Sequence, residues 1–300
     1  MSRYSVIENG PQNINSFHLA GIVPVAGQQL DFNFPWHDCL QPIGKDYLAV
    51  ERAVWECVCA GCETIWIVCH DDMQPLIRHR LGDYAQDPLR FNMPRKTFPT
   101  EHERIIPIYY VPIHPRDRDK RDCLGWSVLY GALTAYWLSK TISKWVVPDK
   151  YYAAFPYGVY DPKLVLPHRK SISSKKPFYV SHENKNIKNN EYLGFTFDAA
   201  DFKEARRIIR KEGTGAFAEY NDSERIPVEK RWSARSFELD KIFTCVTMEE
   251  AKVLPLPWYY NISNWDNLRN YLGSENKLDR PPNNMLGYHE WNLIGEDNEK

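Results

Sequence analysis

The sequence predicts an α/β protein whose mostly parallel sheet is flanked by helices. The main indication is the stretch from His18 to Asp83. Apolar runs typical of buried strands occur there at 19–25 and 64–69, and the segment between them carries apolar residues at helical spacing that stop at Gly61. A strand, a helix and a second strand in this order are typical of a right-handed parallel crossover. Ligands of such sheets bind beyond the carboxyl ends of the strands, so the loop at 27–38 is a candidate binding segment.

The composition agrees with a globular protein and excludes some partners. The chain has 300 residues, of which 43% are hydrophobic, so it can bury a large core. Its 38 basic and 39 acidic residues give a net charge of −1, which predicts no general attraction to nucleic acid or to a membrane surface. Seven cysteines, without a secretory leader or a long apolar span, indicate a cytoplasmic protein. Cys57, Cys59 and Cys62 lack a second ligand cluster, so we expect buried thiols rather than a metal site.

We expect one large domain with polar ends. Two aromatic runs within 153–197 flank an Asn-rich segment, which predicts a β-rich insertion with a hairpin turn near 189–190. The predicted units are an N-terminal arm at 1–16, the α/β domain at 17–273 and a C-terminal tail at 274–300.

Two further strands are predicted from apolar runs at 105–113 and 145–148. Asp149 would then follow the carboxyl end of the second run, where a carboxylate can bind Mg²⁺. The alternative is that this aspartate caps a turn. Later in the chain, helices are expected from Asp198 or Asp201 to Gly213 and from Trp265 to Gly273.

A charged segment at 114–122 is predicted to be a loop. It contains four Lys or Arg residues in addition to His114. Two interpretations stay open: a solvated surface loop, or a loop that binds an anion, because Arg and Lys suit phosphate capture.

Four motifs in a fixed order carry a resemblance to a known family. They are GIVPVAGQQL with HDCLQPI within 21–43, GKDYLAVERAVWECVCAGCETIWIV at 44–68, LGWSVLYGALTA with VVPDKYY within 124–152, and WYYNISNWDNLRNYL at 258–272. The chain resembles the sugar-1-phosphate nucleotidyltransferases, also called nucleoside-diphosphate-sugar pyrophosphorylases, over most of its length. The resemblance implies a Rossmann-like nucleotide-diphospho-sugar transferase fold. It also implies transfer of a nucleotidyl group from a nucleoside triphosphate to a sugar 1-phosphate, with release of pyrophosphate.

The resemblance also implies roles for particular residues. Asp149 falls at the family's Mg²⁺ aspartate, and Asn261 falls at its second metal ligand. The nucleotide would then be contacted by Ala26, Gly27, Gln28 and Gly125.

Two departures from the family pattern concern the cations that hold phosphate groups. The nucleotide loop lacks the family's Arg, and His37-Asp38 stands where the family has a Lys. If the protein is an enzyme, Arg116, Arg118 or Lys45 would have to replace these cations. The alternative is a catalytically inactive member kept as a nucleotide-binding or assembly protein, because a fold does not by itself fix a function. The sequence leaves open whether the chain forms a homo-oligomer.

Overall fold

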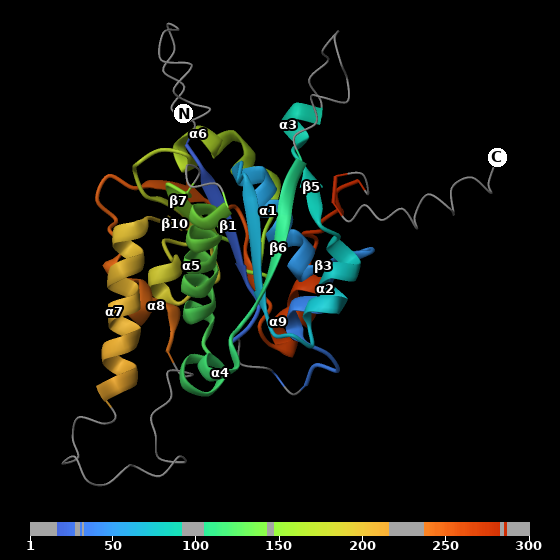
Figure 1. Ribbon diagram of the computed structural model, residues 1–300. Helices are drawn as coiled ribbons and strands as arrows, with labels where there is room; N and C mark the ends of the chain where they lie inside the picture. The colour runs from blue at the N-terminus through green and yellow to red at the C-terminus, as the bar shows by residue number, and fades with distance from the viewer. Residues whose placement is uncertain are drawn as a thin grey trace, which may run out of the picture.

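A central eight-stranded sheet organises the molecule (Figure 1). The computed structural model describes residues 17–27, 31, 33–91, 105–142, 147–215, 237–282 and 285–286. The strand order is β11-β9-β10-β7-β1-β4-β6-β5. The strands of this sheet are β1 (Leu19–Pro24), β4 (Thr64–Cys69), β5 (Tyr84–Gln86), β6 (Ile105–Pro112), β7 (Lys150–Ala153), β9 (Phe178–Ser181), β10 (Phe195–Phe197) and β11 (Lys252–Pro255).

The middle of the sheet is parallel. β1 pairs in parallel with β4 on one side and with β7 on the other, and β4 pairs in parallel with β6. β5 and β10 join this parallel core antiparallel to their neighbours β6 and β7. The mixed, mostly parallel sheet confirms the predicted fold class, and the strand predictions at 19–25, 64–69 and 105–113 are confirmed. In Figure 1 the parallel strands point towards the edge of the molecule where α4 lies, so the carboxyl ends gather there.

Helices cover both faces of the sheet. They are α1 (Ala49–Ala60), α2 (Gln74–Leu81), α3 (Pro88–Phe91), α4 (Pro115–Arg121), α5 (Leu124–Ile142), α6 (Arg169–Ile172), α7 (Ala199–Gly215), α8 (Leu239–Ile242) and α9 (Trp265–Leu272). Gly21 of β1 faces Cys57 of α1, and the next residue, Ile22, contacts Gly131 of α5. Because successive strand residues point to opposite faces, α1 and α5 lie on opposite sides of the sheet.

The start and end signals of several helices are confirmed. Gly61 follows α1 with a left-handed backbone at φ 87°, which a glycine adopts without steric cost. Asp198 accepts hydrogen bonds from the N–H groups of Ala200 and Asp201, at 2.7 and 3.0 Å, and so caps α7. α9 ends before Gly273, as predicted.

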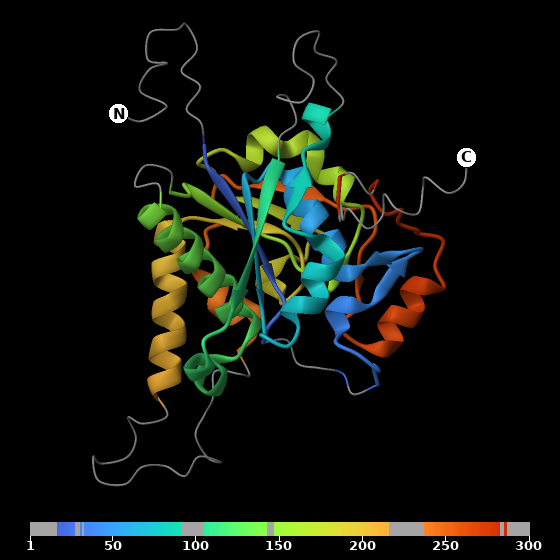
Figure 2. The same cartoon turned by 45° about the vertical axis from the view of Figure 1, so that its right-hand side comes forward.

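A second apolar cluster lies beside the main core. The hairpin of β2 (Pro42–Gly44) and β3 (Tyr47–Leu48) packs against α9, as Figure 2 shows. Tyr271 of α9 donates a hydrogen bond to the Ile43 carbonyl at 2.7 Å. β8 (Gly158–Val159) pairs with β12 (Tyr260–Asn261), and Val159 joins this cluster. The packing therefore fixes α9 and β12 next to the chain that leaves β7.

A buried polar network ties α1 to the carboxyl end of β7. Arg52 donates to Glu56 at 2.9 Å and to the Phe155 carbonyl at 2.5 Å. Glu56 also accepts hydrogen bonds from the hydroxyls of Tyr152 and Tyr160. Both charged side chains are fully buried, so their mutual pairing and these hydrogen bonds replace the water that they lose.

The predicted strand at 145–148 is wrong. Residues 145–146 lie outside the described residues, Val147 and Pro148 are not in a strand, and β7 begins at Lys150. Lys150 is buried because its ammonium group donates to the carbonyls of Ile172, Ser174 and Lys176, at 3.3, 2.9 and 2.6 Å. These three bonds satisfy all the donors of a lysine, so a charged residue can occupy a central strand.

One other segment differs from the sequence predictions. The charged segment predicted as a loop contains a helix, α4, which begins with Pro115 after the His114 cap. Proline suits the first turn of a helix because its missing N–H has no partner there in any case.

The segment predicted as a β-rich insertion supplies β9 and β10, which pair antiparallel within the main sheet. Asn190, near the predicted turn, has a left-handed backbone at φ 62°. No helix among the described residues is long and apolar enough to cross a membrane.

Candidate functional site at the carboxyl ends of the strands

The chain that leaves β1 is held against the beginning of α5. Val25 and Ala26 both donate to the Val68 carbonyl, at 2.8 and 2.9 Å, and Ser127 donates to the Ala26 carbonyl at 2.5 Å. Gly27 has φ 82°, and a Cβ atom there would lie 2.6 Å from the Cys123 carbonyl oxygen. Only glycine fits this close backbone contact, so Ala26 and Gly27 form a fixed start to the predicted nucleotide loop. Gln28 lies outside the described residues.

The other end of this loop is fixed to α9. Asp31 accepts a hydrogen bond from the N–H of Trp265, the first residue of α9, at 2.9 Å. This bond and the one from the Asn33 N–H lower the pKa of Asp31. Of this segment, Gly27 therefore lies beside the beginning of α5 and Asp31 lies beside the beginning of α9.

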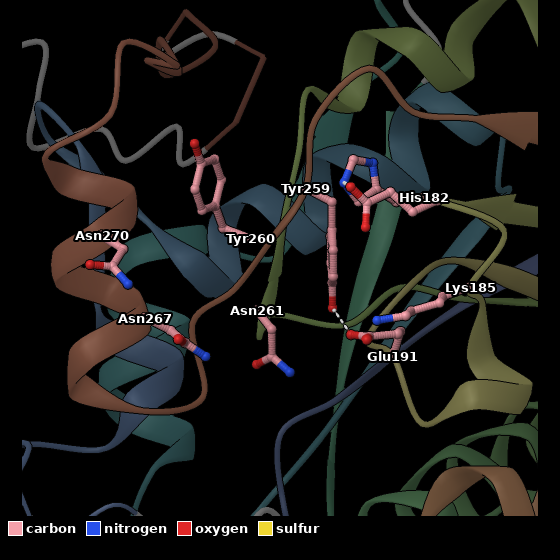
Figure 3. A pocket seen from close by; sticks show the side chains of 9 residues that line it. His182, Lys185, Glu191, Tyr259, Tyr260, Asn261, Asn267 and Asn270 are labelled. Atoms are coloured by element: carbon pink, nitrogen blue, oxygen red, sulfur yellow. Dashed lines mark hydrogen bonds and ion pairs between the residues drawn. The ribbon is translucent and has the colours of Figure 1, made fainter.

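A polar cavity of about 430 Å³ lies beside the end of this loop (Figure 3). Three parts of the chain line it: α9, the end of β12, and the segment between β9 and β10. The lining residues are His182, Glu183, Lys185, Glu191, Tyr259, Tyr260, Asn261, Asn267 and Asn270.

The cavity offers both hydrogen-bond donors and acceptors. Tyr259 donates to Glu191 at 3.1 Å and accepts from the Tyr192 N–H at 3.1 Å. Burial raises the pKa of Tyr259 well above its usual range, so its hydroxyl stays protonated. The Asn261 side-chain oxygen accepts from the Ser263 N–H at 3.1 Å, which directs its amide donors to other partners. Carboxylates, amides and aromatic rings together suit a ligand with several hydroxyl groups.

Asp38 lies beneath this edge of the sheet. It is 1% exposed, and neither of its carboxylate oxygens has a hydrogen-bond partner among the described residues. Burial raises the pKa of Asp38 to about 7 and lowers the pKa of its neighbour His37 to about 4. His37 Nδ1 is 3.2 Å from Asp38 Oδ1. The same nitrogen accepts from the Cys39 N–H at 3.2 Å, so it carries no proton and the two side chains form no ion pair.

Asp38 stands where the resemblance to the sugar-1-phosphate nucleotidyltransferases would place a Lys. An aspartate in place of the family's Lys would face and repel bound phosphate groups if it were exposed. Because Asp38 is buried and its pKa is raised, it does not present a full negative charge to a ligand.

Of the three predicted catalytic cations, the two whose side chains are described lie on different elements. Lys45 is exposed on the turn between β2 and β3. Arg116 is exposed in the first turn of α4, and the side chain of Arg118 lies outside the described part of the structure. Gly125 is buried at the beginning of α5, and a Cβ atom there would clash with Ile242 of α8. That face of Gly125 is therefore closed to a nucleotide.

The predicted metal pair is wrong in its geometry. Asp149 precedes β7, and its side chain accepts from the His18 N–H at 2.8 Å, while its own N–H donates to the His18 carbonyl at 2.9 Å. It therefore caps the amino ends of β1 and β7. Asn261 lies beyond the opposite end of β7, opposite Gly158 in the β8–β12 pair.

These positions do not fit one shared Mg²⁺. The five residue-to-residue steps from Asp149 to Ala154 span roughly 16 Å in an extended strand, whereas the oxygen ligands of one Mg²⁺ lie about 2.0–2.1 Å from the ion. No cluster of three or more His, Cys, Asp or Glu side chains suited to a metal ion occurs among the described residues. Cys57, Cys59 and Cys62 are buried free thiols, as predicted.

Comparison with known proteins identifies the fold. No protein-family model and no curated protein matches the sequence. Among solved structures, the chain is similar to one from Bacillus anthracis, which is named as a glucose-1-phosphate thymidylyltransferase in complex with sucrose. The similarity has a TM-score of 0.52 and 10% sequence identity, and it covers 87% of this chain and 97% of that chain. The chain has the fold of the nucleotide-diphospho-sugar transferases. The 4-diphosphocytidyl-2C-methyl-D-erythritol synthase of Anaerococcus prevotii covers 86% of this chain and 96% of its own, with a TM-score of 0.45 and 12% identity.

Sequence reasoning missed most of the residues that line the cavity. Asn261 was singled out, but as a metal ligand, and the segment with His182 and Glu191 was treated only as a hairpin. The feature of the sequence that could have indicated this cavity is the high content of Asn, Glu and His between two aromatic strands. Such polar residues are uncommon in a buried core.

Proposed function

We propose that the protein is a nucleotidyltransferase-type enzyme that binds a nucleoside triphosphate and a sugar 1-phosphate at the carboxyl edge of its sheet. In the proposed reaction a phosphate oxygen of the sugar 1-phosphate attacks the α-phosphorus of the triphosphate. A new oxygen–phosphorus bond forms, the bond between the α-phosphorus and the bridging oxygen breaks, and pyrophosphate leaves. Catalysis of such a transfer depends mainly on positioning and on neutralising charge.

One observation carries the proposal: the loop that leaves β1 ends on the helix that lines the cavity. Asp31 holds the first N–H of α9, and Asn267 and Asn270 of the same helix line the cavity. A nucleotide beside the loop and a sugar in the cavity would therefore be neighbours, as a transfer between them requires. Mg²⁺ stays part of the proposal as the ion that would neutralise phosphate charge, with no ligand set assigned to it.

A second candidate is binding without turnover, in a nucleotide-binding or assembly protein. The observation that favours it is the position of Asp149, which caps the amino ends of β1 and β7 through His18. A chain that lacks the family's carboxylate at the reacting end could retain the binding surface alone.

Ligand binding is tested by thermal unfolding with the four common nucleoside triphosphates and a panel of sugar phosphates. A ligand at 100 times its dissociation constant stabilises the folded state by about 2.7 kcal/mol. We expect at least one nucleotide and one sugar phosphate to raise the melting temperature. The sugar phosphate effect should be lost in Asn261→Ala and retained in Thr141→Ala, whose exposed side chain at the end of α5 donates to the Trp137 carbonyl and is not among the residues that line the cavity. No stabilisation by any of these ligands would contradict both candidates.

A further inference from the structure

One wall of the cavity is a tight turn that directly follows β9. The His182 N–H donates to the Lys185 carbonyl at 3.0 Å, and the Lys185 N–H donates to the His182 carbonyl at 2.8 Å. The two central residues, Glu183 and Asn184, have φ values of 49° and 62°, as a two-residue type I′ turn requires. A glutamate rarely adopts this left-handed backbone, and such positions cluster at functional sites. The turn therefore fixes His182 and Lys185 beside the cavity (Figure 3).

The orientation of the His182 ring is set by the neighbouring strand β11. The Leu256 N–H donates to the Ser181 carbonyl at 2.7 Å and so continues the parallel pairing of β11 with β9. The Leu256 carbonyl oxygen lies 3.2 Å from His182 Nδ1. A carbonyl only accepts hydrogen bonds, so Nδ1 carries the proton, and in the neutral imidazole Nε2 is an acceptor. The backbone thus fixes both the direction of the ring and the role of each nitrogen.

Two hydrogen-bond acceptors on this wall have no hydrogen bond in the described part of the chain. The first is His182 Nε2, whose neighbour Glu183 Oε1 lies 3.9 Å away, too far for a hydrogen bond. The second is Glu191 Oε1, because Tyr259 donates to the other oxygen, Oε2. Figure 3 shows His182, Lys185 and Glu191 on one side of the cavity and the asparagines on the other. Amides both donate and accept, so only the wall with His182 requires donors from the ligand.

We propose that His182 is a specificity-determining residue whose Nε2 accepts a hydrogen bond from a ring hydroxyl of the sugar phosphate. Glu191 Oε1 accepts from a second hydroxyl in the same way. A site built to accept from a hydroxyl rejects an analogue that lacks it, because the acceptor is then left unpaired. The substrate class is therefore sugar 1-phosphates with free hydroxyls on the carbons that meet this wall. The inference rests on the proposed function for the identity of the ligand as a sugar phosphate.

The test is calorimetric titration of glucose, galactose and mannose 1-phosphates and their monodeoxy analogues into the wild type, His182→Asn and His182→Gln. The amide of Asn can donate to the Leu256 carbonyl in place of Nδ1–H but does not reach the position of Nε2, whereas the amide oxygen of Gln does. We expect one deoxy analogue to bind the wild type about three- to tenfold more weakly than its parent sugar phosphate. His182→Asn should bind the two equally, and His182→Gln should restore part of the difference.

The matched control is His79→Asn, because His79 is exposed on α2 and is not among the residues that line the cavity. It should discriminate like the wild type. The ratio of the parent and analogue affinities is taken within each variant, so a change in the stability of a variant does not alter the comparison. The inference is wrong if no hexose 1-phosphate binds, or if His182→Asn discriminates every analogue as the wild type does.

Pyrophosphate release with the same sugar phosphates separates this inference from the proposed function. Release that depends on the sugar phosphate, with equal preference between parent and analogue in the wild type and His182→Asn, rejects the role of His182 and keeps the function. Discrimination in binding that His182→Asn abolishes, without pyrophosphate release from any triphosphate, supports the role of His182 and rejects the transfer reaction.

Discussion

Burial changes the protonation states of two residues at the edge of the sheet. Asp38 and His37 are adjacent, and burial moves their pKa values in opposite directions, to about 7 and about 4. Between these values both side chains are uncharged, although they are close enough for an ion pair. The low polarity of the site explains this, since burial disfavours the charged form of either group.

The pKa of Asp38 predicts a pH-dependent penalty on stability. Its ordinary value is 3.8, so between pH 3.8 and about 7 the folded state holds a proton that the unfolded state has lost. The contribution of Asp38 to stability therefore falls as the pH rises through this window, by up to about 4 kcal/mol. We expect Asp38→Asn to gain stability relative to the wild type from pH 4 to pH 8. Urea unfolding at several pH values measures this gain.

The titration of His37 also changes the stability of the protein with pH, so the effect of Asp38 has to be measured as a difference between Asp38→Asn and the wild type. Its folded pKa lies below its ordinary value of 6.5, so the unfolded state binds the extra proton and this contribution to stability rises between about pH 4 and 6.5. The two slopes oppose each other in the wild type, whereas the difference between Asp38→Asn and the wild type isolates Asp38. A difference that stays constant with pH would contradict the raised pKa.

At the scale of elements, the sequence predicted strands well wherever they were continuous apolar runs. β1, β4 and β6 fall within the predicted runs because central parallel strands are apolar on both faces. β7 was missed because Lys150 begins it, and the satisfaction of a buried ammonium by three carbonyls depends on tertiary structure. Because β7 begins a few residues later than predicted, Asp149 lies at the amino end of a strand and not at a carboxyl end. The predicted metal site depended on the carboxyl end, so the structure does not contain it in that form.

The remaining site residues could not be predicted for a similar reason. Asn261 and Glu191 are 70 positions apart in the sequence, and they line one cavity only because β12 pairs with β8 and the chain between β9 and β10 lies beside them. Gly27, in contrast, was identified from its motif and does begin the loop.

The loop after β1 depends on Gly27. We expect Gly27→Ala to destabilise the protein by about 1–3 kcal/mol because of the left-handed backbone alone, and by more because the new methyl group would meet the Cys123 backbone. It should also weaken nucleotide binding. Gly273→Ala is the matched control, since Gly273 has a helical backbone and a Cβ atom there has no neighbour closer than 3.4 Å. Urea unfolding of both variants checks the prediction, and equal stabilities would show that the loop is not fixed at Gly27.

At the scale of the whole molecule, the fold brings the start of a loop and a polar cavity to one edge of the sheet. Gly27 lies beside the beginning of α5, Asp31 bonds the first N–H of α9, and the cavity lies against α9. A ligand with a nucleotide, a phosphate chain and a sugar would engage these parts together. The proposed transfer reaction is the chemistry that uses all of them.

The most direct measurement is pyrophosphate release by the purified protein with the four nucleoside triphosphates and a panel of sugar 1-phosphates, with Mg²⁺ and with a chelator. We predict release that requires both substrates, is abolished by the chelator, is reduced in Asn261→Ala, and is retained in Thr141→Ala. Tight binding of a nucleotide and a sugar phosphate without pyrophosphate release from any pair would contradict the transfer reaction and leave a protein that only binds these ligands.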